Sequence, residues 1–508
     1  MGRVQTNTIG LAFAREDSPG VLPGAPKWRI IEPNSISSFG AEIKTVARDP
    51  ISKSRQRRKG STVDLDSPLE LDADLTLGHL RDFIESFCYS IAVGPDAYEG
   101  GNSTATGYTV AALSAGQAGR LKYGVGAAVS LVHARGYANP VNNGLKPVTA
   151  AHAGGATEIK VAGNVVEAVV ATKVYEVAIA GVRGAAGDLE IDANGDLIST
   201  VLDFTTLGLT AGQTIHVGGI DVLNRFFEVE NFGFARVIGI AAHKLTLDRR
   251  SQDYVTDDGT VDNAAGAGLN IDILFGQFVR NVDVDHADYR EITNQVELSE
   301  PGLGDAGQTM FEYATGNYAD AMTLTIPLTD KATFKIGFVG LDTLPPTLVR
   351  ATNAATAKEP VQTSAFGTAS DIARLRAMEV DETGLSTDFK SLGIAFKNNA
   401  AGEKVLGKLG NKYVNAGQLQ IDIEAEMVFT SGAVIAAVRQ NRTIGLDFTL
   451  RNGDGGAHFD IPSATIGGGK RNFKVNESVT VTSTIMAFED AVLGTSVGVS
   501  FFPVLPAN

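Results

Sequence analysis

Cysteine is almost absent from this chain, and histidine is scarce. The single cysteine, Cys88, cannot form an internal disulfide, and we expect it to be a small core residue. The seven histidines show neither the H-x-x-x-H nor the H-E-x-x-H spacing of helical metal sites. These two shortages argue against a disulfide-rich secreted protein and against a metal centre built on cysteine or histidine.

Long hydrophobic runs are also missing. No stretch reaches the roughly 18 consecutive apolar residues that a membrane-spanning helix needs. The opening residues, MGRVQTNTIG, lack the apolar segment of a secretory signal. We therefore expect a soluble chain that is made in the cytoplasm.

Glycine and β-branched residues are plentiful instead. The chain has 508 residues, of which 44% are hydrophobic and 57 are glycine. This length corresponds to two to four domains of roughly 100–200 residues each. Amphipathic helical patterns are few and turn dipeptides are frequent, so the composition predicts a mainly β fold.

The segment from Val63 to Thr76 has the clearest pattern in the chain. Apolar residues occupy alternate positions, and acidic residues occupy most positions between them, which predicts one continuous strand with an apolar face and an acidic face. The acidic residues are Asp64, Asp66, Glu70, Asp72 and Asp74. The next segment, LGHLRDFIESF, predicts a short helix, because its apolar residues recur at helical spacing. These residues are Leu80, Phe83, Ile84 and Phe87.

A second segment, LQIDIEAEMVF, repeats this arrangement about 350 residues later. Asp422, Glu424 and Glu426 alternate with apolar residues, and the helix-like segment TSGAVIAAVRQN follows, with Thr430 or Ser431 as its N-cap and Val434, Ile435 and Val438 on its buried side. Residues 71–75 align with residues 423–427 without a gap. We interpret this as an internal duplication of a β-module. The alternative is that the two segments are unrelated, since amphipathic strands before helices are common.

The remaining patterns predict how the chain is divided. Residues 322–340 and 442–462 each read as two strands joined by a turn, and two more strands follow near the C-terminus. Residues 108–276 are rich in Ala, Gly and Val with many short strands, which indicates a small inserted β-domain. We predict a first module over 1–107 and 277–345, the insertion over 108–276, a linker over 346–365 and a second module over 366–508.

The short motifs that could carry chemistry lack the context they need. GLGDAG (302–307) does not follow a strand in a βαβ unit, so it does not indicate a dinucleotide site. GTSVG (494–498) has no Asp, Glu or His after it to complete a hydrolase triad. His286, with Asp283, Asp285 and Asp288, could hold a cation, but a solvated turn explains the cluster as well. We predict no enzymatic activity, no cofactor and no metal.

A basic segment, KSRQRRKG, stands out in a chain whose formal net charge is −15. Its cations are Lys53, Arg55, Arg57, Arg58 and Lys59. Three interpretations are open: a loop that binds acidic groups on a neighbouring subunit, a solvated basic loop, or a direct nucleic-acid contact. The acidic segment that follows favours the first interpretation over the third. A row of carboxylates facing water repels polyanions and allows nucleic acid to pass without binding.

Taken together, these segments resemble the major tail tube proteins of long-tailed, siphovirus-type bacteriophages. The resemblance extends to 203–219 (DFTTLGLTAGQTIHVGG), 233–248 (GFARVIGIAAHKLTLD), 311–340 (FEYATGNYADAMTLTIPLTDKATFKIGFVG), 459–481 (FDIPSATIGGGKRNFKVNESVTV) and FFPVLP near the end. It implies two tandem β-sandwich or barrel modules, each with a short flanking helix, plus the inserted β-domain. It also implies a structural virion protein, assembled in the host cytoplasm, whose rings stack into the tail.

The resemblance also implies roles for particular residues. Asp64, Asp66, Glu70, Asp72, Asp74, Asp422, Glu424 and Glu426 would line the lumen, and Lys53, Arg55, Arg57, Arg58 and Lys59 would lie on a loop that reaches the next ring. Partners would be further copies of the chain, a tape-measure protein and tail-end proteins, while DNA would pass without specific binding. Family subunits usually form hexameric rings, so two modules per chain favour a trimer that resembles a hexamer.

Two other functions stay open on the sequence alone. A phage capsid or baseplate component would have the same glycine-rich composition and mainly β pattern. An all-β module that binds nucleic acid or glycan would use the basic segment or the inserted domain.

Overall fold

The computed structural model describes residues 6–51, 53–124, 128–262, 266–303, 308–351, 357–379, 384–386, 388–429 and 432–507. The described chain consists mainly of β-strands with three α-helices, so the predicted fold class is confirmed. Five single-turn 3₁₀ helices lie at Thr6–Thr8, Pro140–Asn142, Phe204–Thr206, Val222–Asn224 and Val229–Asn231. The strands fall into three groups, which we call the first strand set, the second strand set and the insertion.

The first strand set comes from both sides of the insertion. It comprises β1 (Gly10–Arg15), β2 (Arg29–Ile31), β3 (Ser35–Ser38), β4 (Glu42–Arg48), β5 (Arg58–Asp66), β6 (Pro68–Asp74), α1 (Leu77–Cys88), β19 (Phe278–Arg280), β20 (Thr293–Leu303), β21 (Gln308–Ile326), β22 (Thr333–Val339) and β23 (Asp342–Thr347).

The second strand set follows in one continuous segment. It comprises β24 (Ile372–Glu379), β25 (Gly384–Ser386), β26 (Phe389–Lys397), β27 (Ala401–Lys404), β28 (Asn411–Asn415), β29 (Gln420–Val428), α3 (Ala433–Gln440), β30 (Thr443–Asn452), β31 (Gly455–Asn472), β32 (Thr480–Phe488) and β33 (Gly498–Phe502).

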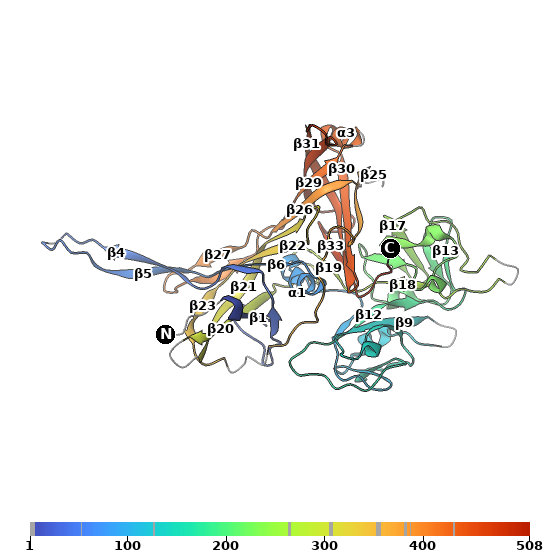
Figure 1. Cartoon of the computed structure of the whole chain (residues 1–508), viewed down its shortest axis with the longest axis horizontal. Helices are drawn as coiled ribbons and strands as arrows, with labels where there is room; N and C mark the ends of the chain where they lie inside the picture. Colours follow the sequence, from blue (N-terminus) through green and yellow to red (C-terminus); the bar gives the residue numbers. More distant parts are fainter. Residues whose placement is uncertain are drawn as a thin grey trace.

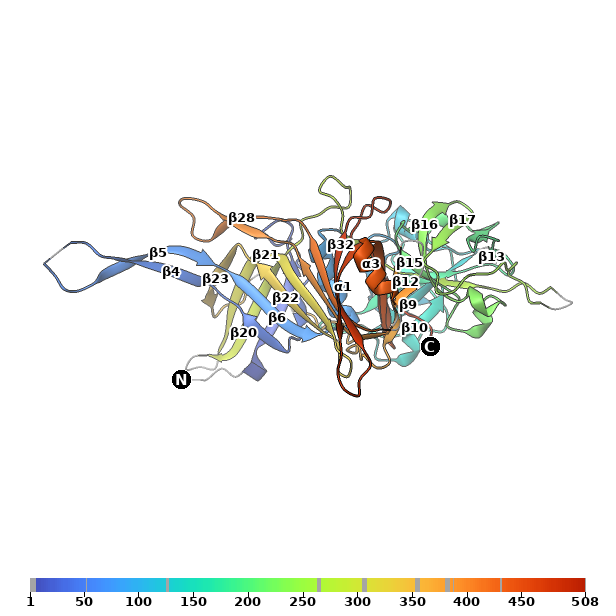
Figure 2. The ribbon, with the colours of Figure 1, turned by 90° about the horizontal axis from the view of Figure 1, so that it is seen from above.

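The insertion has its own sheet and its own apolar core. It comprises β7 (Ala97–Glu99), β8 (Gly107–Thr109), α2 (Ala115–Arg120), β9 (Val129–Arg135), β10 (Gly144–Pro147), β11 (Glu158–Lys160), β12 (Glu176–Arg183), β13 (Leu189–Ile191), β14 (Leu197–Ser199), β15 (Thr214–Val217), β16 (Gly233–Ala241), β17 (Lys244–Asp248) and β18 (Asp272–Leu274). Figures 1 and 2 place it at the end of the molecule opposite the projecting hairpin β4–β5.

The two strand sets have the same strand order. In the first set, β20, β21, β22, β6 and β3 pair in that order, and β23 pairs with the first half of β21. In the second set, β30, β31, β32, β29 and β26 pair in that order, and β33 pairs with the first half of β31. In each set a hairpin precedes the acidic strand and a helix follows it.

The strand sets are joined edge to edge. The second half of β21 pairs with β26, so eight strands run continuously in the order β3, β6, β22, β21, β26, β29, β32 and β31. One apolar core, which includes residues of α1 and α3, lies under both sets. The apolar residues that alternate along the two acidic strands thus pack into one shared core.

Helix α1 forms where its sequence pattern predicts. The Thr76 side chain accepts a hydrogen bond from the His79 amide at 3.2 Å, which caps the N-terminus. The helix ends at Tyr89, whose left-handed conformation closes the last turn. All the predicted apolar residues are buried, and so is Cys88: Leu80, Phe83, Ile84, Phe87.

Helix α3 is shorter and less buried than α1. Val434 is buried as predicted, whereas Ile435 and Val438 are only half-buried. The predicted N-cap residues Thr430 and Ser431 lie outside the described residues, and Gly432 occupies the capping position without a side-chain bond.

Buried ion pairs fix the insertion to the first strand set. Arg81 of α1 donates two hydrogen bonds of 2.6 Å to Glu176 of β12, and Arg135 of β9 donates a third at 3.0 Å. Burial alone would raise the pKa of Glu176, but the two guanidinium groups outweigh it and hold this pKa well below its usual range. The carboxylate is therefore ionised and fully paired.

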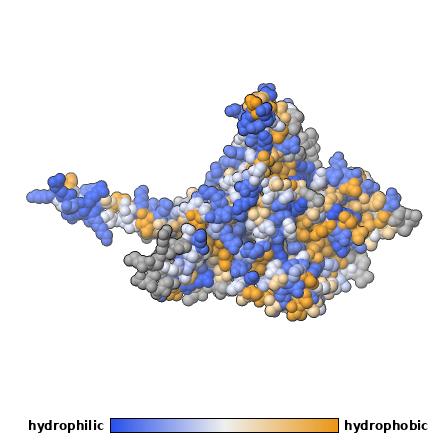
Figure 3. Space-filling model, in the orientation of Figure 1, coloured by the Kyte–Doolittle hydropathy of each residue, from blue (hydrophilic) through white to orange (hydrophobic). Residues whose placement is uncertain are grey.

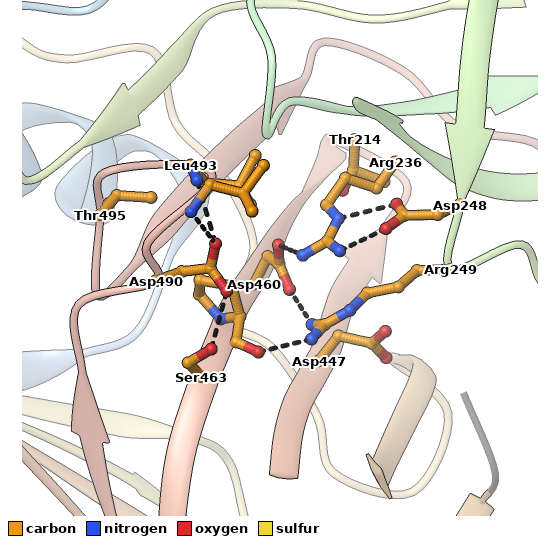
Figure 4. A network of polar contacts seen from close by, with 12 residues as sticks. Thr214, Arg236, Asp248, Arg249, Asp447, Asp460, Ser463, Asp490, Leu493 and Thr495 are labelled. Carbon is orange, nitrogen blue, oxygen red and sulfur yellow. Dashed lines mark hydrogen bonds and ion pairs between the residues drawn. The ribbon is translucent and has the colours of Figure 1, made fainter. Parts of the chain in front are cut away.

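A second buried network fixes the insertion to the second strand set (Figure 4). Arg236 of β16 donates to Asp460 of β31 at 2.9 Å, and Arg249 donates to the other oxygen of the same carboxylate. Arg374 and Arg376 of β24 both donate to the carbonyl oxygen of Arg249, at 2.6 and 2.8 Å. The insertion is thus bonded to both strand sets through arginines that are largely buried.

Candidate functional site: an acidic sheet face and a basic arm

The predicted continuous strand over 63–76 is wrong in one respect: it is broken at Ser67. Asp64 and Asp66 belong to β5, which pairs with β4, whereas Glu70, Asp72 and Asp74 belong to β6 in the eight-stranded sheet. The buried Ser67 hydroxyl lies 2.6 Å from that of Thr343, and Pro68 has no amide hydrogen for a ladder bond. The chain therefore changes strand partners here.

The alternation itself is confirmed in β6. Leu69, Leu71 and Ala73 are at most 1% exposed, while the acidic residues that follow each of them in turn, Glu70, Asp72 and Asp74, are half-exposed. The side chains of an antiparallel strand alternate between its two faces, so the carboxylates share the face away from the core.

Lysines from distant segments pair with the carboxylates of this region. Lys404 of β27 contacts Asp64 at 2.5 Å and Asp66 at 2.6 Å, Lys335 of β22 contacts Glu70, and Lys331 contacts Asp74 at 2.8 Å. The hydrogen bond from Lys404 lowers the pKa of Asp64.

Asp74 is stabilised as an anion in the same way. Partial burial opposes its ionisation, but hydrogen bonds from Lys331 and from Asn34, at 2.8 and 2.6 Å, outweigh this effect and lower the pKa of Asp74. The acidic row of the first strand set is thus partly neutralised, since three lysines pair with four of its five carboxylates.

The acidic row of β29 has neutral partners instead. Asp422 accepts a hydrogen bond of 2.7 Å from Gln420, and Glu426 accepts one of 2.7 Å from Thr480. Glu424 is exposed and lies opposite Gly393 and Thr484. Within the described chain no ion pair involves these three carboxylates, so this row keeps its negative charge.

The strand registers place both acidic rows on the same face. Directly opposite residues of antiparallel strands point to the same side of a sheet. One such row runs across five strands and joins the two acidic strands: Asp72, Lys335, Thr323, Ala395 and Asp422. The next row runs parallel to it: Asp74, Thr333, Thr325, Gly393 and Glu424. The acidic face is therefore one continuous surface, which we call the acidic sheet face.

The predicted basic segment lies at the tip of a long hairpin, which we call the basic arm (Glu42–Asp66). Lys53, Arg55 and Arg57 lie between β4 and β5, and Arg58 and Lys59 begin β5; all five are exposed. Figures 1 and 2 show the arm projecting away from the body, and its surface is mostly hydrophilic in Figure 3. None of its five cations forms an ion pair with another described residue.

The second strand set carries a short hairpin, β27–β28, at the equivalent place between β26 and β29. Its Lys404 reaches the base of the basic arm through Asp64 and Asp66. The two hairpins therefore differ in length and charge but contact each other.

Sequence reasoning missed the lysine partners. Lys331 and Lys335 could have been found, because Lys335 lies in a recognised strand and Lys331 in the turn before it. Lys404 had no such signal, since it lies 338 residues from Asp66 along the chain. Pairings of this range depend on the fold.

Among the described residues, the other sequence motifs do not form a catalytic or metal-binding site. His286 lies 3.5 Å from Asp288 at the surface, within a turn closed by a hydrogen bond from the His286 amide to the Asp283 carbonyl. No group of three or more potential metal ligands occurs in the described parts of the chain. Residues 304–307 of the GLGDAG motif lie outside the described residues. No described helix has the length and apolar character needed to cross a membrane.

Comparison with known families gives one match. A family model described as a phage tail tube protein matches residues 6–487. A comparison with curated proteins found no match. The family is structural and non-enzymatic, and its members form part of the virion tail. Because the match covers nearly the whole chain and the mainly β fold agrees with it, this chain belongs to the phage tail tube protein family.

Proposed function

We propose that this protein assembles into rings that stack into the hollow tail tube of a siphovirus-type phage, with the acidic sheet face lining the lumen. The observation that carries this proposal is the shared face of the two acidic rows, in which Asp72 and Asp422 belong to one cross-strand row. Polar residues are usual on the solvated face of such a sheet, but rows rich in carboxylates are also what a passage for a polyanion requires.

The proposed lumen would act by repulsion. Screening at physiological salt extends over only about 8–10 Å, so a wall of carboxylates acts on DNA that comes close to it. DNA would therefore pass without binding. We assign the lining to Glu70, Asp72, Asp74, Asp422, Glu424 and Glu426. Asp64 and Asp66 belong to the base of the basic arm, because β5 forms a two-stranded sheet with β4, apart from the 17-stranded sheet that contains the eight strands.

We further propose that the two strand sets are tandem tube modules and that three chains form one ring. The repeated strand order supports a duplication, and three chains would then supply six modules. The first module would include β19–β23 and would therefore extend to Thr347, so the linker would begin after that residue instead of at 346, and the second module would begin near Phe366. The insertion would begin before Ala97 instead of at residue 108, since β7 pairs with β12. It would lie on the outside of the tube, where it leaves the passage open.

The basic arm would connect neighbouring rings. A two-stranded hairpin without a supporting layer is marginally stable in water, and this one also exposes Ile43, Val46 and Ile51. Both features suit a segment that gains a partner on assembly. Its cations would pair with acidic groups of the next ring. A tape-measure protein inside the tube and tail-end proteins at its ends would complete the assembly.

Negative-stain microscopy of the purified protein tests this proposal. We expect long hollow tubes whose end-on class averages have threefold symmetry, together with weak binding of free DNA. True sixfold averages would overturn the trimer. Closed shells would favour a capsid component. Persistent monomers that bind DNA tightly, with steep salt dependence, would favour a nucleic-acid-binding module.

A further inference from the structure

Within the described eight-strand order, the two strand sets meet at the pairing of β21 with β26, which we use as a template; their other pairing, β19 with β33, lies outside this order. The second half of β21 pairs with β26 through six residue pairs, which run from Ala321 opposite Lys397 to Ile326 opposite Leu392. The apolar residues of this junction are fully packed, since Met322, Leu324, Ile394 and Phe396 are each at most 1% exposed.

The equivalent strands at the two ends of the sheet follow from the registers. Leu71 of β6 and Ile423 of β29 are equivalent in the repeated order. Ile36 lies opposite Leu71 and Ile394 lies opposite Ile423, so β3 corresponds to β26. Working through β22 and β32 in the same way, Met322 corresponds to Ile466, so the second half of β21 corresponds to the second half of β31.

These two equivalent strands have open edges. In the described chain, β3 pairs only with β6, and β31 beyond Thr465 pairs only with β32. They occupy opposite ends of the eight-stranded order. An open strand edge presents unpaired amide and carbonyl groups and serves as a template for another strand.

The burial of equivalent residues also indicates a missing neighbour. Ile394 and Phe396 are at most 1% exposed in the internal junction. Their equivalents are Ile36 on β3 and Phe39, which directly follows the strand, and both are only half-buried. The same positions are therefore apolar in both strands, but only the internal pair is covered.

We propose that the second half of β31 of one copy pairs antiparallel with β3 of the next copy, in the register of the internal junction. This inference rests on the proposed ring and names the strands that close it. Two residues fall outside the register, since Ser37 and Gly469 are the extra residues at irregular positions of their ladders. The proposed pairs are Ile466 with Phe39, Gly467 with Ser38, Gly468 with Ile36, and Lys470 with Ser35.

Charge supports this register. Lys470 lies opposite Thr482, which lies opposite Glu426, and in the neighbouring copy Ser35 lies opposite Asp72. Lys470 would thus stand two strands, or about 10 Å, from a carboxylate on each side. The junction would place a cation between the acidic rows of two copies, on the same face.

A cysteine pair tests the register. Ser35→Cys combined with Lys470→Cys places two exposed thiols directly opposite each other across the proposed junction. Oxidation of assembled protein should give covalent oligomers that reach three chains and go no further. The native Cys88 is buried and does not compete.

Two matched variants control this experiment. Thr325→Cys with Gly393→Cys places the same pair at the internal junction, where a disulfide within one chain is expected. Ser35→Cys with Lys474→Cys moves one thiol four residues along the chain, past the end of β31 at Asn472, and should give no product.

The outcomes separate this inference from the proposed function. If tubes form and the internal control cross-links, but the cysteines at positions 35 and 470 do not, the proposed strand junction is overturned. The proposed tube function would not be affected. Equal cross-linking of the shifted pair would also overturn the register. Failure of the unsubstituted protein to form any tube or ring would instead count against the proposed function.

Discussion

The two acidic strands β6 and β29 have the same position in their strand sets but different charge environments. Lysines at positions 331, 335 and 404 pair with the acidic residues of β6 and of the adjoining β5. The carboxylates of β29 accept hydrogen bonds from neutral groups. The alternating apolar residues are enough to keep each strand on the core. The net charge of its outer face depends on which residues other segments place beside it.

The hairpins beside these strands differ in the same way. The first strand set has a long basic arm, and the second has the short hairpin β27–β28. If three copies form a ring, sectors whose carboxylates have no lysine partner in the described chain and sectors that are partly neutralised would alternate around the lumen, and three basic arms would leave each ring. The following predictions test whether the two sets have different functions.

Reversing the charge of the basic arm should have the largest effect. For Arg57→Glu with Arg58→Glu we expect a folded subunit that forms few or no tubes, because like charges brought together at an interface cost several kcal/mol. Tube yield by microscopy and sedimentation, with circular dichroism for folding, measures this. The matched control is Lys408→Glu with Lys412→Glu in the short hairpin, which makes the same charge change at two exposed lysines. Normal tubes from the arm variant would mean that the arm is only a solvated surface.

Neutralising the acid that holds the insertion to the second strand set should strongly destabilise the protein. Asp460→Asn leaves Arg236 and Arg249 without their shared carboxylate, at a cost of about 3–5 kcal/mol in the free energy of unfolding. Glu176→Gln tests the equivalent contact with the first set and should cost less, since its partner Arg81 is more exposed than either arginine at Asp460. Denaturant unfolding measures both. Equal stability of Asp460→Asn and the unsubstituted protein would contradict this prediction.

Mild acid should destabilise the folded protein through two histidines of the insertion. Burial lowers the pKa of His133, near the Glu176 cluster, and of His216, near the second set, to about 4 each. In the unfolded chain these histidines bind a proton near pH 6.5. Their contribution to the free energy of unfolding is therefore complete above that pH and is lost as the pH falls towards 4, by about 2 kcal/mol per histidine at pH 5. The pKa values of Glu176 and Asp460 are lowered, so their contributions decline only below about pH 4. Unfolding free energies at pH 7 and pH 5 should therefore differ, and a flat profile would show that these histidines can be protonated in the folded state.

Exchanging single residues between the two acidic strands should have the smallest effect. Thr484→Lys places a lysine directly opposite Glu424, as Lys335 lies opposite Asp72. We expect a gain of about 0.2–1 kcal/mol, and a loss of similar size for the reverse change, Lys335→Thr. Thermal unfolding measures both, and effects of the same sign would show that the two faces are not comparable.

Local patterns predicted a large part of the fold. The alternation in β6 and β29, the helical spacing of α1 and the turn between β30 and β31 all depend on residues close in sequence, and all are confirmed. The break at Ser67 escaped prediction, because it depends on contacts with Thr343 and on a change of partner from β4 to β22. The acidic residues of β6 and β29 alternate with buried apolar residues as expected, but their role as a lumen lining stays a prediction, and their lysine partners were not predicted.

The amino-acid pattern was sufficient to establish which residues face the core and which face water, since that choice repeats every two residues in a strand and involves no distant partner. It could not establish that the two acidic rows share one face, or that β3 and the second half of β31 have an open edge among the described residues. Those properties depend on the pairing of β21 with β26 and on the registers across eight strands. A shift of one residue in any ladder would turn a strand over, so only the assembled sheet specifies the surface that the protein presents.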